Sequence, residues 1–340
     1  MELTKKDTKM LQGLSVLAMV WLHLFDTWDY ADKFIPLLFV GGVPVSFYVA
    51  QLSDFCVFGF AFCSGYGHYI QYQKQNFYRS RLKGLLSVFC SYWIILIFFS
   101  IVALILGQGA YMPGSFRKFI MNALVLENSY NGAWWYMFAY AALVLSSPLL
   151  MKLVKKANSV VVLGVGFIIY CAAYYVRFKM TGTGWLLGKF GLFGMTLFEY
   201  LIGVVCCKQK VVSSLYAVWE KFRKEVRCIL VLILMAAMLY VRTIVVPSSF
   251  VAPVTGFAVM ILFHFWKKPK IVQGLFLFVG QHSTNIWMTH MFFYSVLLKD
   301  FVYMAKYPLL IFLLMMGITI VLSMLLQLIE KPIQSRVARL

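Results

Sequence analysis

Ten mainly apolar stretches, separated by shorter polar segments, recur along the whole chain. Most are long enough to cross a bilayer, which takes about 20 helical residues. These stretches are residues 10–25, 52–72, 84–107, 132–151, 159–176, 185–207, 228–246, 248–266, 273–298 and 307–329. Residues 34–50 are also apolar, but a Gly-Gly-Val-Pro break favours a re-entrant or interfacial segment there. The pattern predicts an all-α polytopic integral membrane protein with about ten transmembrane helices, in a single transmembrane domain over residues 1–340.

Composition and charge agree with this class. With 62% hydrophobic and 13% charged residues, a soluble protein of this size could not keep its apolar surface from water. More than two thirds of the 31 lysines and arginines fall in loops on the side of the two termini. This asymmetry predicts that both termini are cytoplasmic, so the net charge of +19 reflects membrane topology and not a nucleic-acid partner. The seven cysteines form no Cys-x-x-Cys pair and suggest neither disulfides nor a metal site.

The first apolar stretch carries Gln12 near one end and His23 near the other. The pair is separated by about 16 Å along a helix, close to three full turns, so both side chains lie on nearly the same face. A polar pair on one face of an apolar helix indicates an interior pathway. Because imidazole exchanges a proton near neutral pH, we expect His23 to be a general base at the outer end of a buried tunnel. The alternative is a histidine that hydrogen-bonds between helices for packing alone.

Other ionisable side chains within the apolar stretches each call for a partner or a purpose. Asp54 is expected at the depth of His23, where it can orient the imidazole. Glu199 is expected to pair with a basic residue for structure. The side chains of His282 and His290 point in directions about 80° apart around a helix, which is poor geometry for sharing a metal ion. No group of His, Asp or Glu residues has the spacing of metal ligands, so no metal site is predicted.

Two arginines, Arg79 and Arg81, follow the expected cytoplasmic end of the 52–72 stretch. Guanidinium groups recognise phosphate in a bidentate manner, so this pair can hold a phosphorylated cofactor. The alternatives are ordinary cytoplasmic positive charge and contact with lipid headgroups.

Seven short motifs, in order along nearly the whole chain, resemble those of the membrane-bound acyltransferase 3 family. They are LQGLSVLAMVWLHLF (11–25), FAFCSGYG (60–67), YRSRLK (78–83), GAWWYMFAY (132–140), FEYLIGVV (198–205), GQHSTNIWMTH (280–290) and IEKP (329–332). The family has a basic residue eleven positions before an essential histidine, and His23 falls on that histidine. Gln12 stands where the basic residue is expected; its amide can still bond a donor carbonyl or thiol, and Lys9, one turn earlier, is an alternative source of the charge.

The resemblance implies an integral membrane enzyme that moves an acyl group, usually acetyl, from acyl-CoA to a hydroxyl of a surface or lipid-linked glycan. Carried over by position, His23 is the catalytic histidine, and Arg79 and Arg81 contact the CoA phosphates. Trp134, Ser283 and His290 line or brace the substrate pocket, a weaker correspondence.

The resemblance implies acetyl-CoA as a co-substrate, with no permanently bound cofactor, in a multi-pass protein of the cell membrane, here the bacterial plasma membrane. Partners are then acyl-CoA, a glycan or other hydroxyl acceptor, and membrane lipids. The competing hypothesis is an exporter of a glycan or small molecule that uses intramembrane histidines as proton relays. Such transporters often have two related halves with broken helices, and the sequence shows no such halves.

Overall fold

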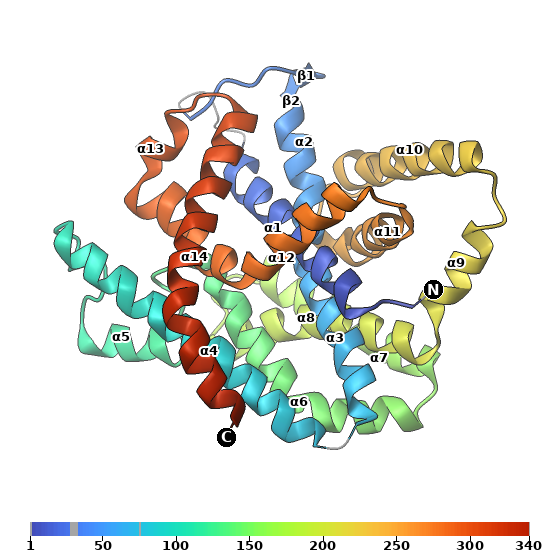
Figure 1. Cartoon of the computed structure of the whole chain (residues 1–340), viewed down its shortest axis with the longest axis horizontal. Coiled ribbons are helices and arrows are strands. Elements are labelled where there is room, and N and C mark those ends of the chain that lie inside the picture. Colours follow the sequence, from blue (N-terminus) through green and yellow to red (C-terminus); the bar gives the residue numbers. More distant parts are fainter. Residues whose placement is uncertain (1, 28–32, 75, 340) are drawn as a thin grey trace. The chain divides into compact units, whose positions relative to one another are not determined.

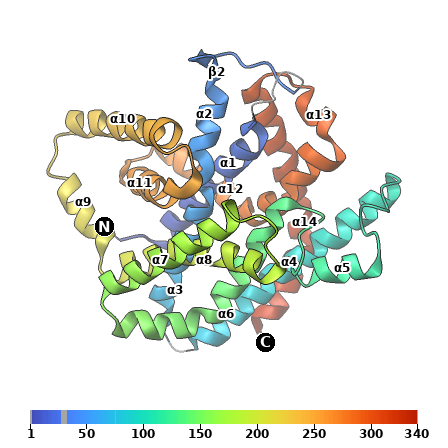
Figure 2. The same cartoon turned by 180° about the vertical axis from the view of Figure 1, so that it is seen from behind.

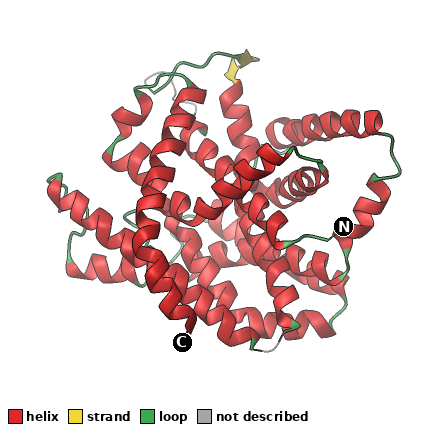
Figure 3. Cartoon of the chain, in the orientation of Figure 1, coloured by secondary structure: helices red, strands yellow, loops and turns green. Residues whose placement is uncertain are grey.

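The structure is a computed structural model that describes residues 2–27, 33–74 and 76–339. It divides into two compact units. The first unit comprises Met1–Lys74 and Leu149–Ser283, and the second comprises Gln75–Pro148 and Thr284–Leu340. Figure 1 shows the order of the elements along the chain, and Figure 2 shows the same cartoon from behind. Almost all of the described chain is helical, apart from one short pair of strands (Figure 3).

In the first unit, a helix is followed by a short hairpin, and further helices then follow in two blocks. The elements are α1 (Lys5–Phe25), β1 (Phe39–Val40), β2 (Val43–Pro44), α2 (Val45–Leu52), η1 (Ser53–Phe55), α3 (Cys56–Tyr72), α7 (Ser159–Phe178), α8 (Trp185–Lys208), α9 (Val211–Trp219), α10 (Lys224–Tyr240), η3 (Val241–Val245), η4 (Ser249–Val251) and α11 (Ala252–Phe265). Helix α8 packs against α7 and α3, and α1 packs against α3 and α2 (Figures 1 and 2). The strands pair antiparallel, Phe39 with Pro44 and Val40 with Val43.

The second unit is also helical, and two helices belong to both units. Its own elements are α4 (Phe77–Ile105), α5 (Phe116–Ala123), η2 (Gly132–Trp134), η5 (Phe292–Leu297), α13 (Lys299–Tyr303) and α14 (Pro308–Arg339). Helix α6 (Trp135–Lys156) starts in the second unit and ends in the first, and α12 (Lys270–Met291) starts in the first and ends in the second. Within the second unit, α4 packs against α14.

The prediction of an all-α polytopic membrane protein is confirmed. Within the described ranges, eight helices are long and apolar enough to cross a membrane, and each overlaps one of the ten predicted spans. The other two predicted spans correspond to a shorter apolar helical stretch, Ser249–Phe265, and to α12 followed by η5. Polar residues at 281–285 make α12 less apolar than its neighbours.

Two predicted boundaries are wrong. In the apolar stretch at 34–50, helical structure is absent before Val45, and Gly41 and Gly42 form the hairpin turn with positive φ values of 57° and 77°. Helix α2 begins directly afterwards at Val45 and continues through η1 into α3. Helix α4 begins at Phe77, seven residues before the predicted span, because arginine, leucine and lysine extend a helix readily beyond its apolar part.

Candidate active site

His23 lies in the last turn of α1, and the sequence fixes both ends of this helix. At the start, Thr4 and Asp7 form a reciprocal capping box. At the end, the Asp26 backbone N–H donates to the Leu22 carbonyl. The His23 side chain is half-buried, whereas the adjacent Leu24 is fully buried. His23 therefore lies in the last turn of a helix whose neighbouring residues on the buried face are covered by protein.

The other end of α1 is fixed by a close contact with α12. A Cβ atom at Gly13 would lie 2.2 Å from the Phe276 carbonyl oxygen, and one at Gly280 would lie 2.1 Å from the Lys9 carbonyl oxygen. Only glycine permits this approach at both positions, as at the small-residue contacts of membrane helices. Gln12 is half-buried beside this contact. Helix α12 therefore sets the position of α1 along its axis at the Gln12 end.

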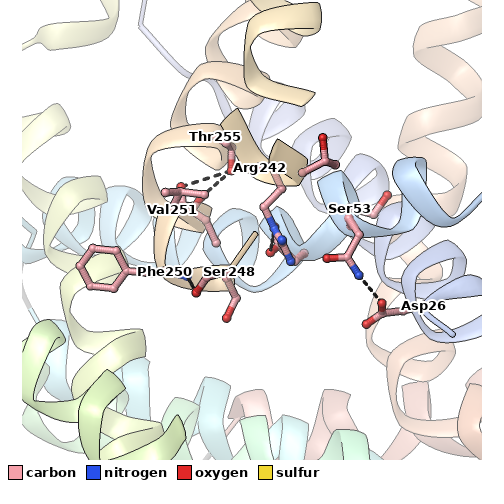
Figure 4. A network of polar contacts seen from close by, with 12 residues as sticks. Asp26, Ser53, Arg242, Ser248, Phe250, Val251 and Thr255 are labelled. Carbon is pink, nitrogen blue, oxygen red and sulfur yellow. Dashed lines mark hydrogen bonds and ion pairs between the residues drawn. The ribbon is translucent and has the colours of Figure 1, made fainter. Parts of the chain in front are cut away.

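A buried ion pair lies in the first unit, and we call Asp54, Glu199 and Arg242 together the Arg242 cluster. Arg242 Nε donates to Asp54 Oδ2 at 2.6 Å, and the two side chains are only 7% and 10% exposed. Glu199, 4% exposed on α8, interacts electrostatically with Asp54. Figure 4 shows Arg242 between the segment that carries Asp26 and the segment that carries Ser248 and Thr255.

This cluster changes two expectations from the sequence. The partner of Asp54 is Arg242, 188 residues away, whereas the sequence suggested that Asp54 orients His23. The expected pairing of Glu199 with a basic residue is wrong, since no ion pair among the described residues includes it and its Oε2 has no hydrogen-bond partner there. Arg242 was overlooked because it is a single charge in an apolar stretch, although its position there is the signal that such a charge needs a buried partner.

Asp26 links α1 to the Arg242 cluster. Its carboxylate accepts a hydrogen bond from the Gln51 side-chain amide and interacts electrostatically with Arg242. Burial raises the pKa of the Asp26 carboxyl above its usual range, while Arg242 and the hydrogen bond from Gln51 oppose this rise. The last turn of α1, which carries His23, is thus followed at once by a residue that faces this polar cluster.

The two predicted phosphate-binding arginines lie in the second unit, inside the first turns of α4 and not in a loop. Arg79 is exposed and Arg81 is half-buried, with Arg81 Nη2 donating to Ser80 Oγ at 3.2 Å. The first turn of α4 has no acidic residue, and Asn76 forms no side-chain cap. The dipole of the helix favours an anion at such a helix start.

Trp134, Ser283 and His290 support the structure from buried positions. Trp134 is completely buried in the second unit, where its Nε1 donates to the Met288 carbonyl at 2.9 Å. His290 is also completely buried, and its Nδ1 donates to the Trp287 carbonyl at 2.8 Å because a carbonyl can only accept. Ser283 Oγ, in the first unit, donates to the Gly280 carbonyl at 2.9 Å. The sequence left open whether these three residues line the substrate pocket or support its walls. Their contacts favour the supporting role.

The second unit contains a buried polar contact that was not predicted from the sequence. Glu330, 3% exposed on α14, accepts a hydrogen bond from Asn285 Nδ2 at 2.9 Å. Gln334, one turn further, donates to Ser91 Oγ on α4 at 3.0 Å. Both Asn285 and Glu330 lie in the motifs singled out above, but contacts across 45 residues are not visible in a pattern. Among the described residues, no group of three or more His, Cys, Asp or Glu could hold a metal ion.

Comparison with known families identifies the family of the chain. The chain matches the family Acyl_transf_3, described as an acyltransferase domain, over residues 8–328. The chain belongs to this family. The resemblance noted from seven short motifs is therefore confirmed, and acyl transfer is the activity of the family. Searches of curated proteins and of solved structures found no match.

The family match spans both units and contains every residue of the candidate site. His23, Gln12, Asp54 and Ser283 belong to the first unit, and Arg79, Arg81, Trp134 and His290 belong to the second. Membership of this acyltransferase family, together with eight membrane-crossing helices in the described ranges, makes the chain a multi-pass membrane protein of an acyltransferase class.

Proposed function

We propose that this protein is an O-acyltransferase that moves an acyl group, expected to be acetyl, from acyl-CoA to a hydroxyl of a cell-surface or lipid-linked glycan. The observation that carries the proposal is a half-buried histidine in a membrane helix of an acyltransferase family member. A neutral imidazole in such a place has the chemistry of a general base. The reaction would take place in the plasma membrane of a bacterial cell.

The donor would bind from the basic, cytoplasmic side. Arg79 and Arg81, in the first turns of α4, offer guanidinium groups to the CoA phosphates, and the dipole of the helix favours an anion there. Gln12 provides an amide for the donor carbonyl or thiol, about 16 Å along α1 from His23. This spacing suits a donor whose charged nucleotide stays at the surface while its acyl end reaches the imidazole. Acyl-CoA is then a co-substrate and not a resident cofactor.

The chemical step balances without a further reactant. The acceptor O–H gives its proton to the His23 imidazole, and the acceptor oxygen forms a bond to the thioester carbon. The C–S bond then breaks, and the CoA sulfur takes the proton from the imidazolium. In the alternative sequence, His23 itself attacks the thioester and passes the acyl group on as an acyl-histidine. Both routes give the same ester and free CoA.

The test measures acyl transfer by the purified full-length chain in lipid nanodiscs. With radiolabelled acetyl-CoA and glycans extracted from the source cells, we expect labelled glycan from the wild type and none from His23→Ala. The matched control is His68→Gln, which removes another buried imidazole, one that hydrogen-bonds with the Tyr200 hydroxyl at 2.8 Å. Folded His68→Gln protein should keep the activity, and full activity of His23→Ala would refute the role of His23.

Rapid-quench experiments separate the two routes. A burst of free CoA before any ester forms, with label attached to the protein, supports the acyl-histidine route. The absence of that burst supports direct attack by the acceptor.

A further inference from the structure

The Arg242 cluster contains buried polar atoms that the proposed step at His23 does not use. Asp54 Oδ1, Glu199 Oε2 and Arg242 Nη1 are all buried and have no hydrogen-bond partner among the described residues. A buried polar group without a partner is costly to the folded state, so three in one cluster call for a function. The set combines two acceptors with one donor, all carried by side chains that protein covers almost completely.

The charges of the cluster restrict the ligand that it can bind. Asp54 pairs with the one guanidinium, and the carboxyl groups of Glu199 and Asp26 both interact electrostatically with Asp54. An anionic ligand would be repelled by this excess of acidic groups. A cation would be repelled by Arg242 and would leave its Nη1 without an acceptor. A neutral hydroxyl can donate to a carboxylate oxygen and accept from Arg242 Nη1 at the same time.

The position of the cluster connects it with His23. Asp26 follows the last turn of α1, three residues after His23, and interacts electrostatically with both Asp54 and Arg242. Three residues correspond to a rise of about 4.5 Å along a helix. The cluster therefore lies toward the end of α1 at which His23 is placed. Arg242 itself belongs to η3, a short π-helical turn, a feature that is frequent at functional sites.

Aromatic rings adjoin the same cluster. The Tyr170 hydroxyl interacts electrostatically with both Asp54 and Glu199. The Tyr170 ring packs against Phe250 at a centroid distance of 5.4 Å and against Phe198 at 5.3 Å. Carboxylates, a guanidinium and aromatic rings together match a sugar, which has hydroxyl groups at its rim and apolar C–H faces.

We propose that the Arg242 cluster binds the hydroxyl groups of a neutral sugar and forms the acceptor subsite of this enzyme. The inference rests on the proposed function, and it adds the class of acceptor: an uncharged sugar unit, not an acidic or amino sugar. Asp54 and Glu199 accept hydrogen bonds from the sugar, and Arg242 donates one. The hydroxyl that receives the acyl group is then next, on the same sugar, to the hydroxyl groups that the Arg242 cluster binds.

Glu199→Gln is the most direct test, because Glu199 Oε2 has no hydrogen-bond partner among the described residues and the substitution keeps the size of the side chain. The purified full-length chain would be titrated with glucose, galactose and N-acetylglucosamine as neutral probes, glucosamine as a cationic probe and glucuronate as an anionic one. Saturation-transfer NMR would measure binding. We expect the wild type to bind a neutral probe best and Glu199→Gln to bind it about tenfold more weakly, or worse, the loss typical of a hydrogen bond to a charged group.

Acyl-transfer kinetics give a second readout. With a neutral sugar as the acceptor, Glu199→Gln should raise the KM for the sugar by the same factor and leave the KM for acetyl-CoA unchanged. The matched control is Thr196→Val, one turn earlier on α8, which removes a buried hydroxyl that donates to the Leu192 carbonyl at 2.8 Å. This control should change neither KM. Arg242→Lys, which keeps a cation for Asp54 but loses the guanidinium donors, should weaken sugar binding as Glu199→Gln does.

The outcomes separate the two proposals. Unchanged sugar binding in Glu199→Gln, stronger wild-type binding of glucosamine or glucuronate than of every neutral probe, or no wild-type binding of any neutral probe would each overturn the acceptor subsite. Wild-type protein that binds a neutral sugar through the cluster but transfers no acyl group would refute the proposed function and leave the sugar subsite standing.

Discussion

Replacing the two partners of the buried ion pair, singly and together, should give an unequal pattern of destabilisation. Arg242→Gln leaves Asp54, Glu199 and Asp26 near one another without a cation. Asp54→Asn leaves Arg242 with Asp26 still close enough to compensate part of its charge. The arginine substitution should therefore cost more than the aspartate substitution, although both break the same 2.6 Å contact.

The magnitudes follow from burial. Removing one partner of a buried pair typically costs about 3–5 kcal/mol, and the side chains here are 7% and 10% exposed. We expect Arg242→Gln to fall in that range and Asp54→Asn to cost about 1–3 kcal/mol, because Asp26 replaces part of the lost attraction. The double variant removes both charges, so it should be less destabilised than the sum of the singles by at least about 1 kcal/mol.

The assay is reversible unfolding in mixed micelles, with tryptophan fluorescence as the signal for each of the four proteins. Arg227→Gln serves as a control, since Arg227 pairs with Glu220 near the surface, where solvent screens the attraction and the loss of the pair should change stability little. Equal losses for the two single variants, or strictly additive losses in the double variant, would refute the account of how the Arg242 cluster is balanced.

Three further changes test other parts of the structure. Gly280→Ala should displace α1 from α12, because its Cβ would lie 2.1 Å from the Lys9 carbonyl oxygen; thermal unfolding should show a clear loss, whereas Gly274→Ala, where a Cβ meets nothing within 4 Å, should not. Arg81→Lys should raise the KM for acetyl-CoA several-fold with little change in kcat, since an ammonium cannot bind phosphate in a bidentate manner. Burial lowers the pKa of Lys268 to about 8, so folded-state stability should increase as the pH rises from about 8 to 10, and Lys268→Met should abolish that increase.

The sequence predicted the helices well because apolar length is a local property. In the part of the chain that the structure describes, all eight helices that could cross a membrane overlap predicted spans, and the motifs, beginning with the one on α1, indicated the family. Boundaries were less accurate where polar residues continue a helix, as at Arg79 and Arg81, which lie inside α4. Hydropathy marks the part of a helix that can lie in lipid, while the helix itself ends where its backbone hydrogen bonds end.

Partners of the buried polar residues could not be predicted, because they come from distant segments. Asp54 and Arg242 are 188 residues apart, and Asn285 and Glu330 are 45 apart. The sequence does indicate that each intramembrane charge needs a partner. It does not indicate which one, since several charges of either sign lie at similar depth. Asp54 was assigned to His23 on depth alone, and the structure shows that its hydrogen bond goes to Arg242.

The placement of α1 connects the fold to the proposed chemistry. Near Gln12, the contacts of Gly13 and Gly280 hold α1 tightly against α12. At the other end, Trp21 Nε1 donates to the Ser46 carbonyl at 3.1 Å, and Asp26 accepts a hydrogen bond from Gln51. Contacts at both ends prevent α1 from sliding by a turn, which would move the imidazole by about 5.4 Å. Since attack on a thioester requires the reacting atoms to lie about 3–3.5 Å apart, such a shift of the imidazole would abolish transfer although no residue of the site is lost.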